Sequence, residues 1–279
     1  MSNAKSGPNA LRVSATDMAL VQITRAGRIA TVTFDRGNKA NALSLDLMQE
    51  LTQAARSFEN DHETACVILR GRDDNFCLGF DLTDPASLAL KDMPLSQRRV
   101  AFSLGSRLCK AWEDIAPLTI CAIEGWCVGG GVALAAACDL RIASETTTFY
   151  VPEIARGLNM SWGSVPRITN LVGPAKSKRL IILAEKLTAT DAVLWGLADR
   201  IAPSGSTLAA ATNWAETAGQ MPPVALRMCK RDINAYANAL AGVASHSDYD
   251  DFTLMYGSDD SAEGIASFVE KRPPDFKGN

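Results

Sequence analysis

The sequence has only two histidines, His62 and His246, among its 279 residues, and both stand in polar segments. No HExxH motif or other paired-histidine spacing occurs, which argues against a histidine-based metal site and against a Ser-His-Asp triad. The glycine motifs include neither GxGxxG nor GKS/T, so nothing in the sequence indicates a nucleotide cofactor. We therefore expect no metal and no cofactor, and chemistry that depends on carboxylates, hydroxyls and backbone dipoles.

Long apolar runs and an excess of basic charge are absent as well. No window of about 18 consecutive apolar residues occurs, so the sequence predicts no membrane-spanning helix. The 28 basic residues are outnumbered by 31 acidic residues and the net charge is −3. Because no block of lysine and arginine stands out, a nucleic-acid groove has no electrostatic support. The expected partner is therefore neither a nucleic acid nor a membrane.

Disulfide signals are missing too, since the seven cysteines are odd in number and form no CxxC pair. They are Cys66, Cys77, Cys109, Cys121, Cys127, Cys138 and Cys229. Most stand inside apolar runs, and we interpret them as reduced thiols that fill core space, which indicates a cytoplasmic protein. Residues 1–17 are small and polar and lack the apolar stretch of a signal peptide, so we interpret them as a flexible leader.

What the sequence does contain is an alternation of predicted strands and helices. Two β-branched runs, residues 19–24 and 29–35, are joined by a short glycine-containing connection and predict a hairpin. Ser44 is the expected N-cap of a helix whose apolar residues recur at helical spacing: Leu47, Met48, Leu51, Ala55 and Phe58. Further strands are predicted at 65–69, 118–123 and 140–143, a loop at 76–84, a long helix at 95–114 and a short helix ending at Cys138.

This alternation is typical of βα crossover units and of a sheet that is covered on both sides. From about Pro203 onward the pattern is helical only, with breaks at Pro222-Pro223 and Gly257. The sequence thus predicts an α/β fold in which residues 18–204 form the core and residues 205–279 form a helical region.

Three consecutive glycines, Gly129, Gly130 and Gly131, stand between a predicted strand and a predicted helix. Glycine lets the backbone approach a ligand closely, and amides at a helix start point outward with the positive end of the helix dipole behind them. Such a site stabilises an oxyanion, although the glycines alone are equally consistent with tight packing of strand against helix. A second glycine-bearing turn, residues 76–82 (Phe-Cys-Leu-Gly-Phe-Asp-Leu), favours the oxyanion site.

Six segments, in chain order, form a pattern: residues 38–44 (Asn-Lys-Ala-Asn-Ala-Leu-Ser), 76–82, 125–139, 151–154 (Val-Pro-Glu-Ile), 173–176 (Gly-Pro-Ala-Lys) and 264–272 (Gly-Ile-Ala-Ser-Phe-Val-Glu-Lys-Arg). Together they resemble the crotonase, or enoyl-CoA hydratase/isomerase, superfamily. The resemblance implies a crotonase-like spiral of ββα units followed by a helical trimerisation region. It also implies an acyl-CoA thioester as substrate and a homotrimer, or a hexamer built from two trimers.

The resemblance further implies an oxyanion hole made of two backbone amides, those of Phe80 and Gly130, which hold the thioester oxygen as it gains enolate charge. Hydratases of this family carry two glutamates, whose positions here are Ala133 and Glu153. A third family position, an aspartate in some isomerases and in a dehalogenase, is Ser161. The expected catalytic residues are therefore Glu153, Phe80 and Gly130, with Glu153 as the one general acid/base.

A single carboxylate suits double-bond migration, because it can remove a proton at the α-carbon and return it at the γ-carbon. Hydration normally uses a second group to position water, so Ala133 argues against it. Single-glutamate members that hydrate or cleave phenylpropenoyl thioesters nevertheless carry a segment similar to residues 125–131. Two alternatives stay open: an enoyl-CoA hydratase or hydratase/lyase with one glutamate, and a non-catalytic paralogue that binds CoA or RNA.

The residues expected to bind the substrate are Lys39, Ala40, Leu78, Gly79, Asp81, Trp126, Gly129, Ala133, Ser161, Trp162, Phe268 and Lys271. Trp162 follows Glu153 closely, and it either lines an acyl pocket or packs in the core. The same alternatives hold for Trp126, Tyr150 and Met160.

Asp81 has an alternative interpretation as an acceptor for the amides of its turn, and so does Asp139 beside a strand. Phe268 and Lys271 occupy family positions that contact the adenine and the phosphates of CoA, often on a neighbouring subunit. A lysine is a suitable partner for phosphate, and an ordinary exposed lysine is the alternative.

Overall fold

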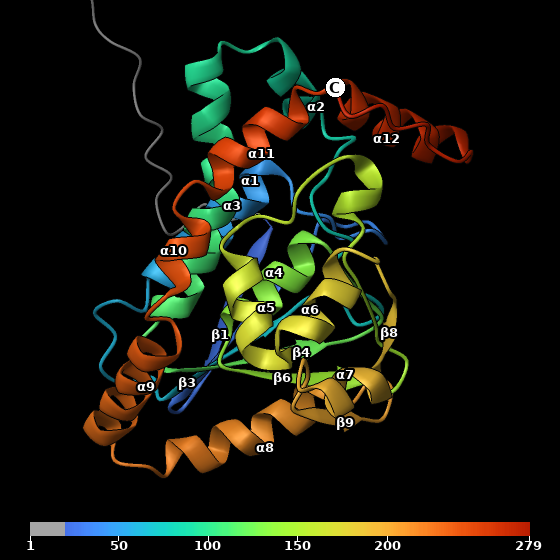
Figure 1. Cartoon of the computed structure of the whole chain (residues 1–279). Coiled ribbons are helices and arrows are strands. Elements are labelled where there is room, and N and C mark those ends of the chain that lie inside the picture. The colour runs from blue at the N-terminus through green and yellow to red at the C-terminus, as the bar shows by residue number, and fades with distance from the viewer. Residues whose placement is uncertain (1–19) are drawn as a thin grey trace, which may run out of the picture.

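The computed structural model describes residues 20–279 and shows two β-sheets with helices packed around them (Figure 1). The predicted leader, residues 1–17, and Ala19 at the start of the first predicted strand lie outside the described residues. Both sheets are mixed, since each contains parallel and antiparallel neighbours.

The larger sheet has six strands in the order β1-β2-β3-β4-β6-β9. They are β1 (Val21–Ala26), β2 (Ile29–Phe34), β3 (Cys66–Arg70), β4 (Leu118–Ile123), β6 (Leu140–Ser144) and β9 (Arg200–Ala202). The β1–β2 hairpin is antiparallel, as predicted, and Gly27 takes a positive φ of 57° in its turn. The other neighbours are parallel, and the strands predicted at 65–69, 118–123 and 140–143 are confirmed.

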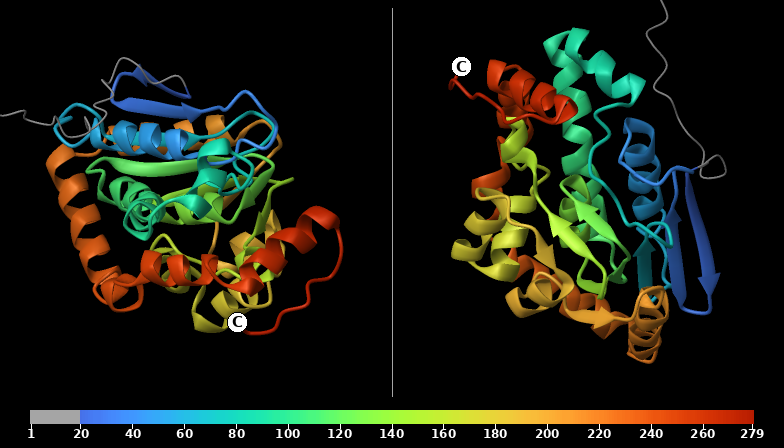
Figure 2. Two further views of the ribbon diagram at one scale, coloured as in Figure 1. Left: turned by 90° about the horizontal axis from the view of Figure 1, so that it is seen from above. Right: turned by 90° about the vertical axis from the view of Figure 1, so that its right-hand side faces the viewer.

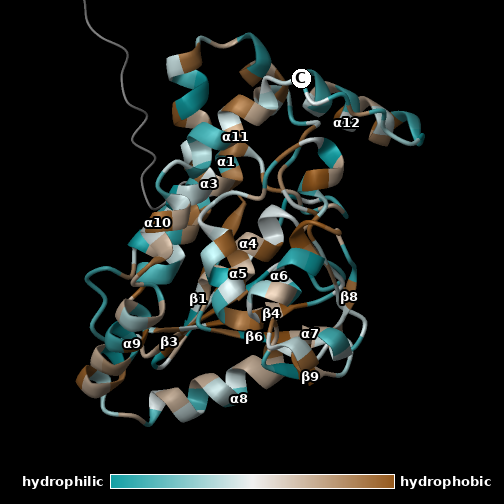
Figure 3. Ribbon diagram, viewed as in Figure 1, coloured by the Kyte–Doolittle hydropathy of each residue, from teal (hydrophilic) through white to brown (hydrophobic). Residues whose placement is uncertain are grey.

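Successive residues of the central strands face opposite sides of this sheet, as the two-residue period of a strand requires. Val67 and Leu69 pack into the larger core cluster with α1 (Leu45–Arg56), α3 (Leu95–Asp114) and α4 (Gly130–Ala137). Cys66 and Ile68 face the opposite side, where the alanines of α8 (Thr207–Gly219) cover the sheet. The prediction of a sheet covered on both sides is confirmed, and Figure 3 shows β3, β4 and β6 as hydrophobic strands at its centre.

The smaller sheet, in the order β5-β7-β8, is not predicted from the sequence. Its strands are β5 (Trp126–Val128), β7 (Thr148–Tyr150) and β8 (Leu187–Thr188). Segments of two or three residues are too short to show the alternation that identifies a strand. This sheet places β5 and η2 (Glu153–Arg156), a short 3₁₀ helix that follows β7, on one side of the site described below.

The remaining helices complete the molecule. They are α2 (Pro85–Ala89), η1 (Leu90–Asp92), η2 (Glu153–Arg156), α5 (Ser164–Val172), α6 (Pro174–Ile181), α7 (Ala189–Trp195), α9 (Pro223–Ala237), α10 (Ala241–Ser245), α11 (Asp248–Tyr256) and α12 (Asp259–Glu270). Within residues 203–279 only helices occur, as the sequence predicts, and Figure 2 shows that they wrap around the sheet before returning to α3 and η2. Of the helices in the described part of the chain, none has the length and apolar character needed to cross a membrane.

Candidate active site

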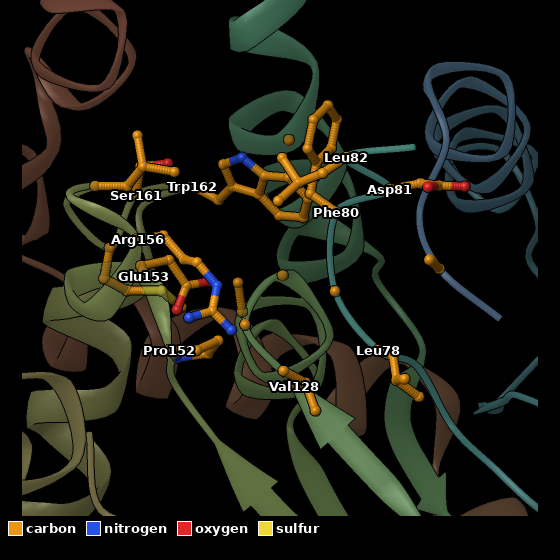
Figure 4. Close-up of a pocket in the computed structure, with 18 of the residues that line it drawn as sticks. Leu78, Phe80, Asp81, Leu82, Val128, Pro152, Glu153, Arg156, Ser161 and Trp162 are labelled. Carbon is orange, nitrogen blue, oxygen red and sulfur yellow. The ribbon is translucent and has the colours of Figure 1, made fainter. Parts of the chain in front are cut away.

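A cavity of about 540 Å³ lies where the loop after β3, the β5–α4 junction, η2 and α11 meet (Figure 4). Thirteen of the fifteen residues expected at the site line it: Ala40, Leu78, Gly79, Phe80, Asp81, Trp126, Gly129, Gly130, Ala133, Glu153, Ser161, Trp162 and Phe268. The other two lie outside it. Lys39 is exposed on the loop before Ala40, and Lys271 lines a neighbouring groove together with Phe268 and Arg156.

Two backbone hydrogen bonds join the loop after β3 to β5. The amide of Cys77 donates to the carbonyl of Trp126, and the amide of Val128 donates to the carbonyl of Cys77, both at 2.9 Å. Gly79 follows with a φ of 89°, and a Cβ there would lie 3.0 Å from the Val128 oxygen and 3.5 Å from the Gly130 nitrogen. Because only glycine fits this position, the backbone after Gly79 comes directly beside the first turn of α4.

The amides of Phe80 and Gly130 both remain without an acceptor at this junction. Leu43 pairs with the residues on either side of Phe80: its amide donates to Gly79 at 2.8 Å, and its carbonyl accepts from Asp81 at 3.0 Å. Gly130 is the first residue of α4, where amides have no partner within the helix. Within residues 20–279 neither amide donates a hydrogen bond, and both residues line the cavity, so this pair suits an anionic oxygen.

Glu153 begins η2 directly opposite the start of α4. Gly129 has φ 51° and ψ −113°, and a Cβ there would overlap Oε1 of Glu153, so the carboxyl group rests against bare backbone. The Oε2 atom is buried and has no hydrogen-bond partner in the described part of the chain. Burial raises the pKa of Glu153 to about 7, although its own amide and the charge of Arg156 oppose the rise. A carboxyl group with this pKa can both accept and release a proton at neutral pH.

Among the described residues that line the cavity, Asp81 is the other carboxylate, and its oxygens are already engaged. It accepts hydrogen bonds from the amides of Thr83 and Asp84 and from the guanidinium of Arg36. Burial opposes the change, but the bonds from Thr83 and the charge of Arg36 hold the pKa of Asp81 below its usual value. Asp81 therefore stabilises its turn, and Glu153 is left as the carboxyl group that is free to act in the cavity.

Ala133 and Ser161, the positions where the resemblance implies acidic residues in other family members, are both buried in the cavity wall. Neither side chain can exchange a proton as a carboxylate does. Ser161 also accepts a hydrogen bond at its carbonyl from the Ser164 hydroxyl, at 2.5 Å, which fixes the turn before α5. The cavity thus combines two unpaired amides with one carboxyl group, that of Glu153, that is not engaged by the other described residues.

Trp162 is held in a left-handed backbone conformation, with φ 65°, that side chains rarely adopt. Its indole ring lies between α3 and α4, so a Cβ on either Gly105 or Gly130 would overlap it. Two contacts hold the turn: Arg167 donates to the Trp162 carbonyl at 3.0 Å, and Asp248 of α11 accepts from the Gly163 amide at 2.6 Å. Both sequence interpretations of Trp162 therefore apply, since the ring packs in the core and also lines the cavity.

Several cavity residues are not anticipated from the sequence. Phe102 and Phe252 form an edge-to-face pair across α3 and α11, with ring centroids 5.0 Å apart. Lys186 lies over the rings of Trp126 and Tyr150, at 5.7 and 5.1 Å from their centroids. Contacts so distant along the chain leave no local signal in the sequence.

Arg156 also lines the cavity and is not anticipated. Its position three residues after Glu153 is the signal that could have indicated it, because helical side chains at this spacing share a face.

The chain was compared with protein-family profiles and with curated proteins. The profile described as enoyl-CoA hydratase/isomerase matches residues 24–279. A probable enoyl-CoA hydratase of Mycobacterium tuberculosis, echA6, is 34% identical over 259 residues, which cover 93% of this chain and 100% of that protein. A short-chain-enoyl-CoA hydratase of Clostridium acetobutylicum is 29% identical over 253 residues, covering 90% and 95% of the two chains.

Solved structures with the same fold were also found. An enoyl-CoA hydratase/isomerase of Xanthobacter autotrophicus superposes with a TM-score of 0.81 at 26% identity, over 90% of this chain and 94% of that one. An enoyl-CoA hydratase of Mycobacterium avium subsp. paratuberculosis has a TM-score of 0.81 at 24% identity, over 93% and 99% of the two chains. The α/β crotonase fold expected from the sequence is thereby confirmed.

The raised pKa of Glu153 predicts a pH-dependent difference in stability between the protein and its Glu153→Gln variant. The folded protein holds the proton up to about pH 7, whereas the unfolded chain releases it near pH 4.5, the ordinary value. Stability from this group is therefore complete below pH 4.5 and is lost as the pH rises to 7, by up to about 3 kcal/mol. Urea unfolding of both proteins from pH 4.5 to 8 measures the difference, and a constant difference would contradict the assignment.

The position of the Trp162 ring predicts that Gly105→Ala is destabilising. The added methyl group must displace the ring, which we expect to cost about 1–3 kcal/mol. Gly219→Ala is the matched control, because it is also a helical glycine, on α8, and nothing lies within 4 Å of its added Cβ. That variant should be neutral or more stable by up to about 1 kcal/mol. Denaturant unfolding compares the two, and equal effects would show that the ring does not fill this space.

Proposed function

Because the chain belongs to the enoyl-CoA hydratase/isomerase (crotonase) family, which acts on acyl-CoA thioesters, we propose that it moves the double bond of an enoyl-CoA. The observation that carries this proposal is the combination of two unpaired amides with a single free carboxyl group in one cavity. The proposal distinguishes this chain from a hydratase with two glutamates.

In the proposed reaction the amides of Phe80 and Gly130 donate hydrogen bonds to the thioester oxygen. The negative charge that develops there makes the α-carbon acidic, and ionised Glu153 removes an α-proton to give a dienolate. The same carboxyl group then returns the proton to the γ-carbon as the thioester carbonyl re-forms, so the double bond moves by one position and Glu153 is regenerated. Losing one amide donor typically costs about 3 kcal/mol of transition-state stabilisation.

The remaining cavity residues have proposed places around this substrate. Leu78 and Trp126, each 42% exposed, lie at the mouth of the cavity, where the pantetheine arm of CoA would enter past Lys39 and Ala40. Phe268 and Lys271 line the adjoining groove, which suits the adenine and phosphates of a CoA molecule whose acyl group lies in a neighbouring subunit. The seven cysteines are all free, which supports the proposed cytoplasmic location.

Hydration by one glutamate is the second candidate function. It is favoured by the names of the relatives, which include enoyl-CoA hydratases at about 30% identity. It is opposed by Ala133, which leaves no second carboxyl group to position a water molecule. A role as a CoA- or RNA-binding paralogue without activity has no comparable support, since burial has tuned the pKa of Glu153 to a value useful in catalysis.

The test is a panel of 2-enoyl- and 3-enoyl-CoA thioesters assayed separately for hydration and for double-bond migration. We expect migration to exceed hydration, and Glu153→Gln to lose at least about 10²-fold in rate because it cannot transfer the proton. Ala133→Glu should raise hydration relative to migration by supplying the second carboxyl group. Full turnover by Glu153→Gln would overturn the mechanism, and binding of a short RNA without binding of CoA would overturn the function.

The assembly proposed for this chain is a homotrimer, or a hexamer of two trimers, formed through the C-terminal helices. Large apolar side chains along α9 and α10 are exposed in the single chain: Val224, Met228, Ile233, Tyr236, Leu240 and Val243. Several large apolar side chains exposed along consecutive helices support an interface in this region.

This proposal predicts that Tyr236→Glu, at a side chain 89% exposed in the single chain, weakens assembly. Burying a charge in an apolar interface is costly, so the variant should dissociate at concentrations where the original protein stays assembled. Leu194→Glu on α7, at a side chain 75% exposed, is the control and should leave the trimer intact. Sedimentation velocity measures both, and a fully active monomer of the original sequence would contradict the proposal.

A further inference from the structure

Arg156 places a positive charge in the cavity beside the proposed base. Glu153 and Arg156 are the first and last residues of η2, and in a 3₁₀ helix side chains three residues apart eclipse one another. Both side chains therefore extend from the same face of η2, and both line the cavity (Figure 4). The rise of a 3₁₀ helix separates the two positions by roughly 6 Å along the helix axis.

The guanidinium of Arg156 has no anionic partner among residues 20–279. No carboxylate lies within 4.0 Å of it, and its hydrogen bonding is limited to the carbonyl of Ala155 at 3.5 Å, a long and weak contact. The cavity wall around it is largely apolar and includes Leu158, Met160 and Phe252. Arg156 is partly buried in this wall, and the partial loss of water lowers the pKa of its guanidinium, so the unpaired charge suits a ligand that supplies an anion.

Phe268 and Glu153 both lie beside Arg156, but neither forms an ion pair with it. Its central carbon lies 3.7 Å from the centroid of Phe268, so the ring stacks on the flat face of the guanidinium. Stacking leaves the N–H groups at the edge free for a bidentate partner. Glu153 is close enough to feel the charge but forms no ion pair with it, and burial still keeps the pKa of Glu153 near 7.

We propose that Arg156 binds a carboxylate at the far end of the acyl chain, so that the preferred substrate is a mono-CoA thioester of an unsaturated dicarboxylic acid. The inference rests on the proposed function, because it places the reacting carbons between Glu153 and the amides of Phe80 and Gly130. Because Glu153 and Arg156 lie close together on η2, the acyl chain must be short, with its carboxylate a few carbons beyond the double bond.

The test compares thioesters in pairs of equal carbon number: pent-2-enoyl-CoA with the mono-CoA thioester of pent-2-enedioic acid, and the corresponding six-carbon pair. The original protein should prefer the dicarboxylic member in kcat/KM by about 10- to 100-fold, the usual effect of a hydrogen bond between charged groups. Arg156→Gln should reduce this ratio to near one, mainly by raising KM for the dicarboxylic member. Arg156→Lys should keep part of the preference, since it retains the charge without the planar fork.

A preference for the neutral member in the original protein would overturn the inference while leaving the proposed function in place. Equal losses for both members in Arg156→Gln would also overturn it, because they would assign Arg156 to the phosphates of CoA or to the packing of α12. Thermal unfolding of each variant identifies the packing effect. If no thioester in either pair is turned over but other enoyl-CoA thioesters are, the inference fails and the proposed function stands. If no enoyl-CoA is turned over at all, the proposed function itself fails.

Discussion

The site depends on close approach of bare backbone at Gly79 and Gly129. At Gly79 the missing side chain lets the loop after β3 pair with β5. A Cβ built on Gly79 would lie only 3.5 Å from the Gly130 nitrogen. At Gly129 the missing side chain lets the carboxyl group of Glu153 rest on the start of α4. A methyl group at either position would separate the two unpaired amides or push Glu153 toward water, where its pKa would return to the ordinary value. The pair of unpaired amides and the raised pKa of Glu153 thus both depend on the absence of side chains at Gly79 and Gly129.

Other parts of the molecule stabilise this arrangement at some cost. The buried Oε2 of Glu153 has no partner in the described residues, and Trp162 keeps a backbone conformation that is unfavourable for its side chain. Strain of this kind persists only where the surroundings determine the conformation, and here Arg167, paired with Glu113, and Asp248 do so. Glu153 and Trp162, which face the cavity, therefore lower the stability of the fold, and the contacts of Arg167 and Asp248 behind them compensate.

The sequence predicts the large sheet and the glycine turns well, because their signals are local. The cap at Ser44 and the limits of α3 and β4 are confirmed residue by residue. The smaller sheet is missed because its strands are too short to show a period. Phe252 and Lys186 are missed because only the tertiary fold brings them to the cavity. The positions of Glu153 and Gly130 are predicted, but the pKa of Glu153 is not, since it depends on burial that no local pattern reveals.

The hydrogen bond from Gly163 to Asp248 joins residues 85 positions apart and has a consequence for biosynthesis. Asp248 and Phe252 lie in α11 and Phe268 lies in α12, so several helices separate all three from the last strand, β9. The ribosome delivers these residues late, after the whole sheet has been translated. A nascent chain that has completed its sheet therefore still lacks one wall of the cavity, and the Trp162 turn has no acceptor from α11. Translation order thus makes the binding cavity mature after the sheet that supports it.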